Sequence, residues 1–178
     1  MAAGLTERDR LFLEIDLERD SGNPVAVSPE CDDATSGLVL AAPERIPLAE
    51  QCLPVCGAAS FSSSDRNALP HQLWDRVVVC VTDLTRNRVV AESLADPSPI
   101  PGDELAPEDD GLTIDPSLPD EPSSGADVPL QGGGMIQYRN FDAVAVLGMN
   151  LEPGPYAVFL TYGKYKSNTV IVTVLEPA

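Results

Sequence analysis

The stretch Leu151–Val174, "LEPGPYAVFLTYGKYKSNTVIVTV", decides the fold class of this chain. Apolar side chains recur at every second position in its middle and at its end. The residues that share a face are Tyr156, Val158, Leu160 and Tyr162, and then Val170, Val172 and Val174. A period of two is typical of strands with one buried side, whereas a helix would spread these residues around its surface. The pattern predicts two antiparallel strands joined by the turn "GKYKSN".

Similar patterns elsewhere predict further strands. "LFLEIDLE", with alternating Leu11, Leu13, Ile15 and Leu17, predicts an early strand. The segment 75–93, "DRVVVCVTDLTRNRVVAES", predicts a hairpin, and its first strand is central because both faces carry apolar side chains. "FDAVAVLGMNL" before Leu151 predicts another strand. Between Val25 and Phe61, the short apolar runs "PVAV", "GLVLAA" and "IPLAE" predict weaker ones. We therefore expect an all-β chain forming an antiparallel sandwich of about seven to nine strands.

The segment "LEPGPY" resembles the tyrosine corner of immunoglobulin-like sandwiches, with Leu151, Pro153, Gly154 and Tyr156 in the matching places. The resemblance to bacterial immunoglobulin-like modules extends over about Phe141–Val174. It implies that the Tyr156 hydroxyl bonds back to the turn. The chain departs from antibody domains because Trp74 precedes the central strand and no cysteine pair frames it. Such modules serve in adhesion, docking, enzyme accessory roles and protease inhibition, so fold alone does not define function.

An acidic segment interrupts these patterns. Residues 92–130 contain eleven acids and eight prolines, with neither lysine nor arginine, and "GGG" at Gly132–Gly134 follows. Such a composition cannot bury enough apolar surface to offset the entropy of ordering. We expect one β-sandwich domain over residues 1–178, with an extended or disordered acidic, proline- and glycine-rich insertion at 94–134.

Charge restricts the classes of partner. The chain has 28 acidic and 11 basic residues and a formal net charge of −17. This charge repels phosphate backbones and anionic lipid, so we expect neither a nucleic-acid nor a membrane partner. No window reaches the roughly 20 apolar residues of a membrane span. The first twenty residues lack the apolar core of a secretory signal, so the chain as written is expected to be cytoplasmic, with an exported mature form as the alternative.

Cysteines and carboxylates raise the question of a metal. Cys31, Cys52, Cys56 and Cys80 fit two disulfides, four thiols or a zinc tetrahedron, but paired zinc-knuckle spacing is missing. In the acidic insertion, Asp109, Asp110 and Asp115, with Asp120, offer oxygen ligands for calcium. They lack the alternating spacing of a calcium loop. We predict no metal and no cofactor.

Catalytic residues do not form a recognisable set. His71 is the only histidine, it lies among Pro70, Leu73 and Trp74, and no "GxSxG" motif accompanies it. We therefore expect a protein that is not an enzyme. A carbohydrate-active hydrolase that uses carboxylates of the insertion is one alternative.

The basic and aromatic residues give the candidate binding sites. "GKYKSN" places Tyr165 between Lys164 and Lys166, the only lysines of the chain, and "QYRNFD" contains Tyr138 and Arg139. An exposed basic and aromatic turn fits an acidic or aromatic partner. The leading hypothesis is a non-catalytic protein-interaction or structural module that acts through its loops and sheet edges. A protease inhibitor on the same scaffold is the other alternative, and self-association or a larger assembly is also considered.

Overall fold

Two β-sheets form the protein in the computed structural model, which describes residues 4–31, 37–61, 73–95, 128–129 and 135–176. Sheet A has the strand order β1 (Gly37–Ala41), β3 (Pro54–Phe61), β7 (Met135–Asp142), β6 (Val128–Pro129). Sheet B has the order β2 (Arg45–Pro47), β10 (Val170–Leu175), β8 (Gly154–Tyr162), β4 (Val78–Asp83), β5 (Arg88–Ser93). A short strand, β9 (Tyr165–Lys166), also pairs with β8. Single-turn 3-10 helices occupy Leu48–Glu50 and Trp74–Arg76.

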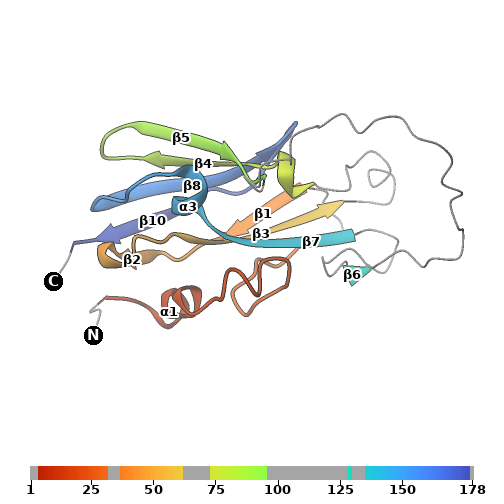
Figure 1. Cartoon of the computed structure of the whole chain (residues 1–178), viewed down its shortest axis with the longest axis horizontal. Coiled ribbons are helices and arrows are strands. Elements are labelled where there is room, and N and C mark those ends of the chain that lie inside the picture. The colour runs from red at the N-terminus through yellow and green to blue at the C-terminus, as the bar shows by residue number, and fades with distance from the viewer. Residues whose placement is uncertain (1–3, 32–36, 62–72, 96–127, 130–134, 177–178) are drawn as a thin grey trace, which may run out of the picture.

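The two sheets share one hydrophobic core. Sheet A contributes Val55 and Phe61, and sheet B contributes Val81, Val158 and Val172, all in one cluster of buried residues. The sheets lie one above the other in Figure 1. The prediction of an all-β chain is confirmed, and the arrangement is compatible with a β-sandwich.

Sheet A is covered on its second face by the N-terminal segment. Phe12 and Val27 of this segment pack with Ala41 and Cys56, which lie on β1 and β3. The Asn140 amide on β7 donates to the carbonyl oxygens of Asp20 and Asn23, at 2.6 and 2.8 Å. Figure 1 shows helix α1 (Glu7–Leu13) on the side of sheet A that faces away from sheet B. Sheet A therefore lies between two layers.

The early strand predicted at Leu11–Leu17 is wrong, because residues 7–13 form helix α1. Thr6 caps the helix in a reciprocal capping box with Asp9: the Thr6 Oγ1 accepts from the Asp9 amide, and the Asp9 carboxylate accepts from Thr6. Asp9 and Phe12, one turn apart, are the buried residues of the helix, while Leu11 is 40% exposed. The capping box and the burial of one helix face favour a helix here, although the leucines alternate as they would in a strand.

The strand predicted over "FDAVAVLGMNL" is also corrected. β7 ends at Asp142, and Ala143–Leu147 forms the short helix α3. The Asp142 carboxylate accepts hydrogen bonds from the Val144 amide and the Leu53 amide, each at 2.9 Å. Gly148 ends the helix with φ 56°, a left-handed conformation that favours glycine.

Strand pairing differs from the prediction in one further respect. β2 pairs with β10 in parallel, so the sheets are not wholly antiparallel. These strands are far apart in the sequence, so no tight turn forces them to run in opposite directions. The described residues contain ten strands rather than seven to nine, and β6 and β9 have two residues each.

Both predicted hairpin partnerships are confirmed. β4 pairs antiparallel with β5, around a turn in which Asn87 has φ 52°. β4 also pairs with β8, so it is a central strand as expected. β8 and β10 pair antiparallel, and the predicted apolar faces point into the core.

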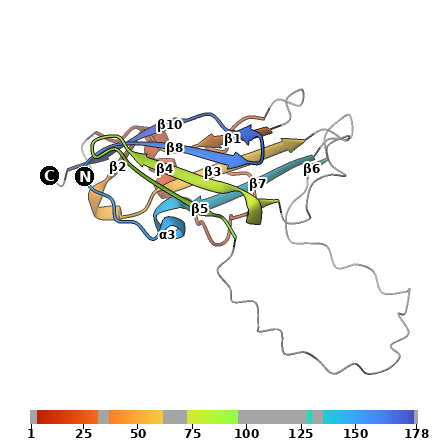
Figure 2. The ribbon, with the colours of Figure 1, turned by 90° about the horizontal axis from the view of Figure 1, so that it is seen from above.

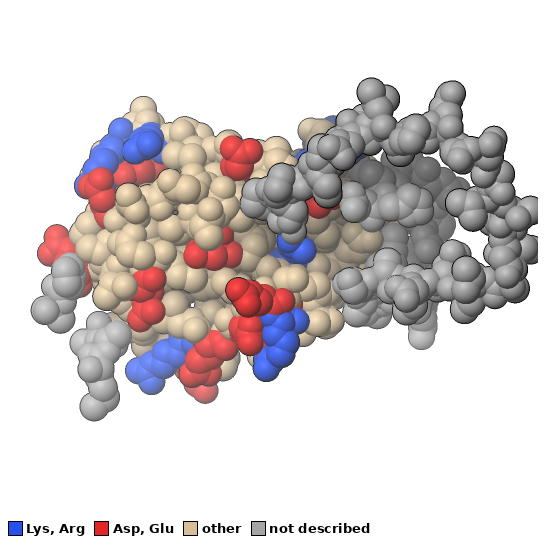
Figure 3. All heavy atoms as spheres, viewed as in Figure 1, with Lys and Arg blue, Asp and Glu red and all other residues tan. Residues whose placement is uncertain are grey.

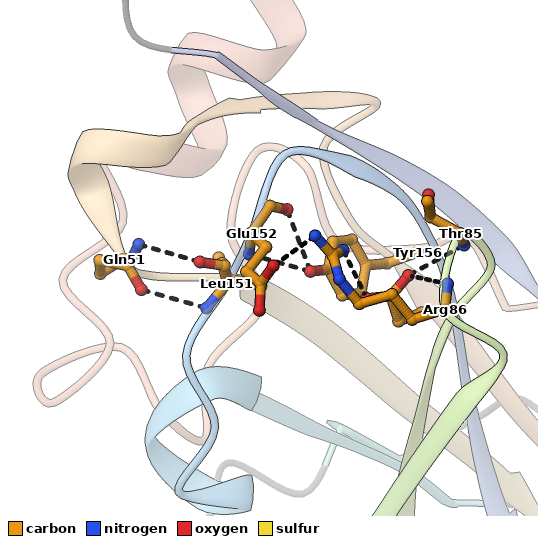
Figure 4. Close-up of polar contacts among 7 residues, drawn as sticks. Gln51, Thr85, Arg86, Leu151, Glu152 and Tyr156 are labelled. Atoms are coloured by element: carbon orange, nitrogen blue, oxygen red, sulfur yellow. Dashed lines mark hydrogen bonds and ion pairs between the residues drawn. The ribbon is translucent and has the colours of Figure 1, made fainter.

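A polar network fixes the chain where β8 begins (Figure 4). The Tyr156 hydroxyl donates to the Glu152 carbonyl at 3.0 Å and accepts from the Glu152 amide at 2.9 Å. The Gln51 side chain accepts from the Leu151 amide and donates to the Leu151 carbonyl. Arg86 forms ion pairs with both Asp83 and Glu152. The expected return of the Tyr156 hydroxyl to the turn is therefore present.

Candidate protein-binding surface

The predicted lysine turn is held against the ends of both sheets. Gly163 has φ 54°, which closes the short turn between β8 and β9. The Tyr165 ring meets the Phe61 ring edge-on, with centroids 5.4 Å apart at 80°. Lys164 places its Nζ 5.2 Å from the centroid of the Tyr165 ring. Tyr165 is thus half-buried and packs the turn against Phe61, while Lys164 is exposed.

Lys166 lies over a second aromatic ring. Its Nζ is 4.0 Å from the centroid of Phe159, which lies on β8. Buried Ser167 fixes this position, since its Oγ accepts from the Leu160 amide at 2.9 Å and its amide donates to the Leu160 carbonyl at 2.9 Å. A cation over an aromatic ring is stabilised by about 0.5–1 kcal/mol at an exposed site. The second lysine therefore has a defined place beside an apolar ring.

Phe159 belongs to a surface that we name the outer face of sheet B. It consists of the side chains that alternate with the core residues on four strands. The members are Val78, Cys80 and Thr82 on β4; Val89, Ala91 and Ser93 on β5; Pro155, Ala157, Phe159 and Thr161 on β8; and Ile171 and Thr173 on β10. These positions carry no charged side chain, in a chain with net charge −17. The two other strands of sheet B border this area with positive charges, since Arg45 on β2 pairs with Thr173 and Lys166 on β9 pairs with Thr161. Val89 is 63% exposed and Ile171 is 48% exposed.

The two sheets differ in how their outer faces are covered. Phe12 and the rest of the N-terminal segment cover sheet A, whereas the side chains at Val89 and Ile171 are open to solvent. Figure 2 shows β5, β4 and β8 side by side in the same layer. Acidic and basic atoms are interspersed on the side of the molecule shown in Figure 3. An uncharged, solvent-facing sheet surface is a common feature of protein interaction sites.

Cys80 lies within this surface, almost buried between its neighbours. Burial raises the pKa of the Cys80 thiol, and the hydrogen bond with Thr161 and the charge of Lys166 act in the opposite direction. Cys52, Cys56 and Cys80 are free thiols. Burial raises the pKa of Cys56 to about 12. Burial, together with Asp142 and Glu50, raises that of Cys52 to about 12. These thiols are poor nucleophiles at neutral pH.

Tyr138 and Arg139, the second predicted site, do not form one patch. They are neighbours on β7, so their side chains leave opposite faces of sheet A. Tyr138 pairs across the sheet with Ala58 on the covered face, and burial raises the pKa of its hydroxyl, with a smaller contribution from Cys31. Arg139 pairs with Gly57 on the core side, and its Nε is buried with no hydrogen-bond partner among the described residues. Binding by either residue stays a prediction.

The other candidates cannot be placed. Asp109, Asp110, Asp115 and Asp120 lie outside the described residues, as do His71 and nearly all of the acidic insertion. In the described ranges, no group of three or more histidine, cysteine, aspartate or glutamate residues could hold a metal ion. The prediction of no metal and the calcium alternative are therefore both untested at the insertion.

Comparisons with known proteins give no relative from which a role could be transferred. Neither a protein-family model, nor a curated protein, nor a solved structure matches the chain. Within the described part of the chain, no helix has the length and apolar character needed to cross a membrane.

The outer face of sheet B was not predicted, although the sequence contained a signal for it. The strand pattern drew attention to the inward residues, such as Val158 and Val172. The alternate residues, Phe159 and Ile171 among them, are also uncharged. A half-buried antiparallel strand normally alternates apolar with polar residues. Apolar residues on both faces of three neighbouring strands therefore indicated a second surface to be covered.

Proposed function

We propose that this chain is a non-catalytic, immunoglobulin-like module that binds a protein partner through the outer face of sheet B and the lysine turn beside it. The observation that carries the proposal is the uncharged, solvent-facing outer face of sheet B, bordered by Lys166 over Phe159. Sheet A has no comparable surface in the described chain because the N-terminal segment covers it.

The strand order supports the immunoglobulin-like assignment. Variable-type immunoglobulin sandwiches have one sheet of order A-B-E-D, and their other sheet contains G-F-C-C′. The order β1-β3-β7-β6 follows the first pattern, and β10-β8-β4-β5 follows the second. In that family the tyrosine corner precedes strand F, and Tyr156 has the corresponding position at the start of β8. β2, parallel to β10, is an addition to this scheme.

The chemistry of the surface defines the partner. Apolar side chains at Val89, Phe159 and Ile171 fit an apolar patch, while Lys164 and Lys166 at one end fit carboxylates or aromatic rings. Interfaces of this kind combine an apolar centre with a polar rim. We therefore propose a protein partner with an apolar contact area and acidic or aromatic residues at one side.

The described residues that flank two long segments of the chain also lie at the lysine end. Phe61 pairs with Met135 at the end of sheet A, and Phe61 contacts Tyr165. Ser93 and Thr161 pair with the same residue, Val78, at the matching end of sheet B. The chain thus enters and leaves the segments 62–72 and 96–127 at the end that carries the lysine turn. Recognition in sandwich folds commonly uses loops gathered at one end.

Parallel affinity capture from native lysate tests the proposal. Three baits are compared: the intact chain, the double variant Lys164→Ser with Lys166→Ser, and a control with Arg8→Ser and Arg10→Ser. The control removes the same charge from exposed positions on α1, and Arg8 also lies over an aromatic ring, Phe12, at 5.9 Å. Tyr165 is kept in all baits because it packs on Phe61. A protein captured by the intact chain and the control, but reduced with the lysine variant, supports the proposal, whereas equal yields on all three baits contradict it.

The alternatives considered from the sequence gain no observation that favours them. A carbohydrate-active site built from the carboxylates of the insertion concerns residues outside the described ranges. A protease inhibitor on this scaffold is distinguished from the proposed module by inhibition assays against a protease panel.

A further inference from the structure

β5 is the outermost strand of sheet B. It is the last strand in the sheet order and pairs with β4 (Figure 1). Four of its six residues are exposed: Arg88, Val89, Ala91 and Glu92. An edge strand presents backbone N–H and C=O groups that can pair with another strand.

The hydrogen-bond alternation identifies the groups that point away from β4. The Leu94 amide donates to the Val77 carbonyl at 2.9 Å, so Leu94 faces β4. In an antiparallel ladder every second residue faces the neighbouring strand. Val89, Ala91 and Ser93 therefore present their backbone groups outward. The Ser93 amide agrees with this, since it donates at 3.1 Å to the side chain of its own neighbour, Glu92.

The other sheet edges in the described chain are protected. On β1, the Asn168 side chain accepts from the Leu40 amide and donates to the Leu40 carbonyl, both at 2.9 Å, so it occupies the edge as a strand would. β2 has three residues and ends at Pro47, and β6 has two residues, one of them Pro129. β5 contains no proline, and its register with β4 is continuous, without a bulge. Natural sheets use short edge strands, proline, bulges and covering side chains to prevent edge pairing, and β5 has none of these four. Charged side chains are a further such device, and the two charges of β5, Arg88 and Glu92, have opposite signs.

When two copies of β5, "RVVAES", run in opposite directions, Arg88 of each copy lies opposite Glu92 of the other, so their charges are complementary. We propose that β5 pairs antiparallel with β5 of a second copy of this chain, about a two-fold axis at Val90. This register places Arg88 opposite Glu92 of the second copy, twice by symmetry. It also places Val89 opposite Ala91, both of which present backbone groups outward, so two such pairs exchange backbone hydrogen bonds. Arg88 and Glu92 are then a non-hydrogen-bonded pair, in which side chains approach most closely.

Val90 contributes the centre of this contact. It lies opposite Val81 on β4 and meets Val90 of the second copy across the axis. Val89, on the outer face, gains cover from Ala91 of the second copy. Sheet B then continues through the axis as one sheet. The self-pairing shares Val89 and Ala91 with the proposed binding surface, but the lysine turn, Phe159 and Ile171 take no part in it. Charge reversal at Arg88 and Glu92, which are not part of the outer face, therefore tests the self-pairing separately from the proposed function.

The expected dimer is weak and depends on concentration. One short strand pair buries less than the standard interface of about 1,600 Å². The net charge of −17 also opposes association at long range. At physiological ionic strength the Debye length is about 8 Å, which screens this repulsion more than the close Arg88–Glu92 pairs.

Sedimentation equilibrium of the full chain, up to about 1 mM at physiological salt, tests the proposal with charge-reversal variants. The intact chain is expected to form a dimer. Arg88→Glu alone and Glu92→Arg alone place like charges opposite each other at both pairs, so each variant is expected to be monomeric over the same range. An equimolar mixture of the two variants restores opposite charges at both pairs and is expected to form the dimer again. The double variant, Arg88→Glu with Glu92→Arg, is expected to dimerise as the intact chain does.

A second variant blocks the backbone rather than the charges. Ala91→Pro removes an N–H that points outward, so it leaves the ladder with β4 intact and removes pairing to the second copy. Far-ultraviolet circular dichroism and melting curves establish that each variant is folded. If Ala91→Pro does not fold, the charge-reversal variants alone test the dimer. An intact chain that stays monomeric overturns the proposal. So does a dimer that persists in the single reversals, or one that the equimolar mixture fails to restore.

Discussion

The hydroxyl of Tyr156 is bonded to both backbone groups of Glu152, accepting from the amide at 2.9 Å and donating to the carbonyl at 3.0 Å. One side chain therefore closes the turn that leads into β8, the strand at the centre of sheet B. Because Tyr156 is 1% exposed, neither backbone group finds water as an easy replacement at this position.

Tyr156→Phe is expected to lower the free energy of unfolding by about 1–2 kcal/mol, since it removes a buried hydroxyl and leaves its partners unsatisfied. Urea denaturation measures the change. Tyr162→Phe, at the other end of the same strand and half-buried, is the matched control and should have the smaller effect. An unchanged midpoint for Tyr156→Phe would show that the hydroxyl does not stabilise the corner.

Gly154→Ala is expected to destabilise the protein more than Gly148→Ala. Both glycines have positive φ, at 141° and 56°. A Cβ at position 154 would lie 2.7 Å from the Thr85 Oγ1, whereas no atom lies within 4 Å of a Cβ at position 148. Thermal unfolding measures the loss in both variants, and removal of the Thr85 side chain separates the clash from the backbone cost. Adding Thr85→Ala to Gly154→Ala should recover part of the loss, and no recovery would exclude the clash as its cause.

Asp9 makes stability depend on pH. Its carboxylate is 1% exposed and accepts from Thr6, Glu44 and Arg45 amides. Burial alone would raise its pKa, but these hydrogen bonds and that from the Thr6 hydroxyl lower it below the ordinary value. A lowered folded-state pKa stabilises the fold above the unfolded-state pKa of about 3.9, and this stabilisation is lost as the pH falls through the folded-state pKa.

Asp9→Asn is therefore expected to cost roughly 1–3 kcal/mol at pH 7, because an amide oxygen cannot serve all these donors. The difference from the intact chain should shrink below about pH 4, where Asp9 itself becomes protonated. Urea denaturation at pH 7 and pH 3 measures both values. A difference that is the same at both pH values would exclude this role for the Asp9 charge.

Cys56 is expected to resist alkylation in the folded protein. Its side chain is fully buried, and burial raises its pKa to about 12. At pH 8 the thiolate fraction is then on the order of 10⁻⁴, even before access is considered. Mass spectrometry after treatment with iodoacetamide should find Cys56 modified in urea and unmodified in buffer. Rapid modification in buffer would contradict the burial of β3.

The pairing of strands near the C-terminus could be predicted, but parts of the N-terminal half could not. Alternation at Tyr156–Val174 is long and strict, and the structure follows it. The leucines at 11–17 also alternate, yet the Thr6 and Asp9 capping pair starts a helix there, and the strand pattern gave no weight to caps.

β3 was missed for a different reason. All of its residues are buried, and small ones such as Gly57 remove the usual signal. A Cβ at Gly57 would lie 3.0 Å from the Trp74 ring, so packing rather than strand propensity selects this residue.

The candidate surface was predictable only in part. The lysine turn could be identified because Lys164 and Lys166 are the only lysines in an acidic chain. That Lys166 would lie over Phe159 depends on the β8–β9 register, which a sequence pattern does not supply. Ile171 is exposed because the N-terminal segment packs on sheet A and leaves the outer face of sheet B open. Because that segment was predicted to be a strand, its role as the cover of sheet A could not be foreseen.

The measurement that tests the central claim most directly is calorimetric titration of a captured partner with Ile171→Glu and Leu11→Glu. Both residues are exposed leucine-sized side chains, at 48% and 40%, but Ile171 lies on the outer face of sheet B and Leu11 lies on α1. Each change adds one negative charge, and exposed positions are expected to alter stability by only about 0.5 kcal/mol. We expect Ile171→Glu to weaken binding at least about tenfold, which is about 1.4 kcal/mol, and Leu11→Glu to leave it unchanged. Equal affinities for the two variants would contradict binding through the outer face of sheet B.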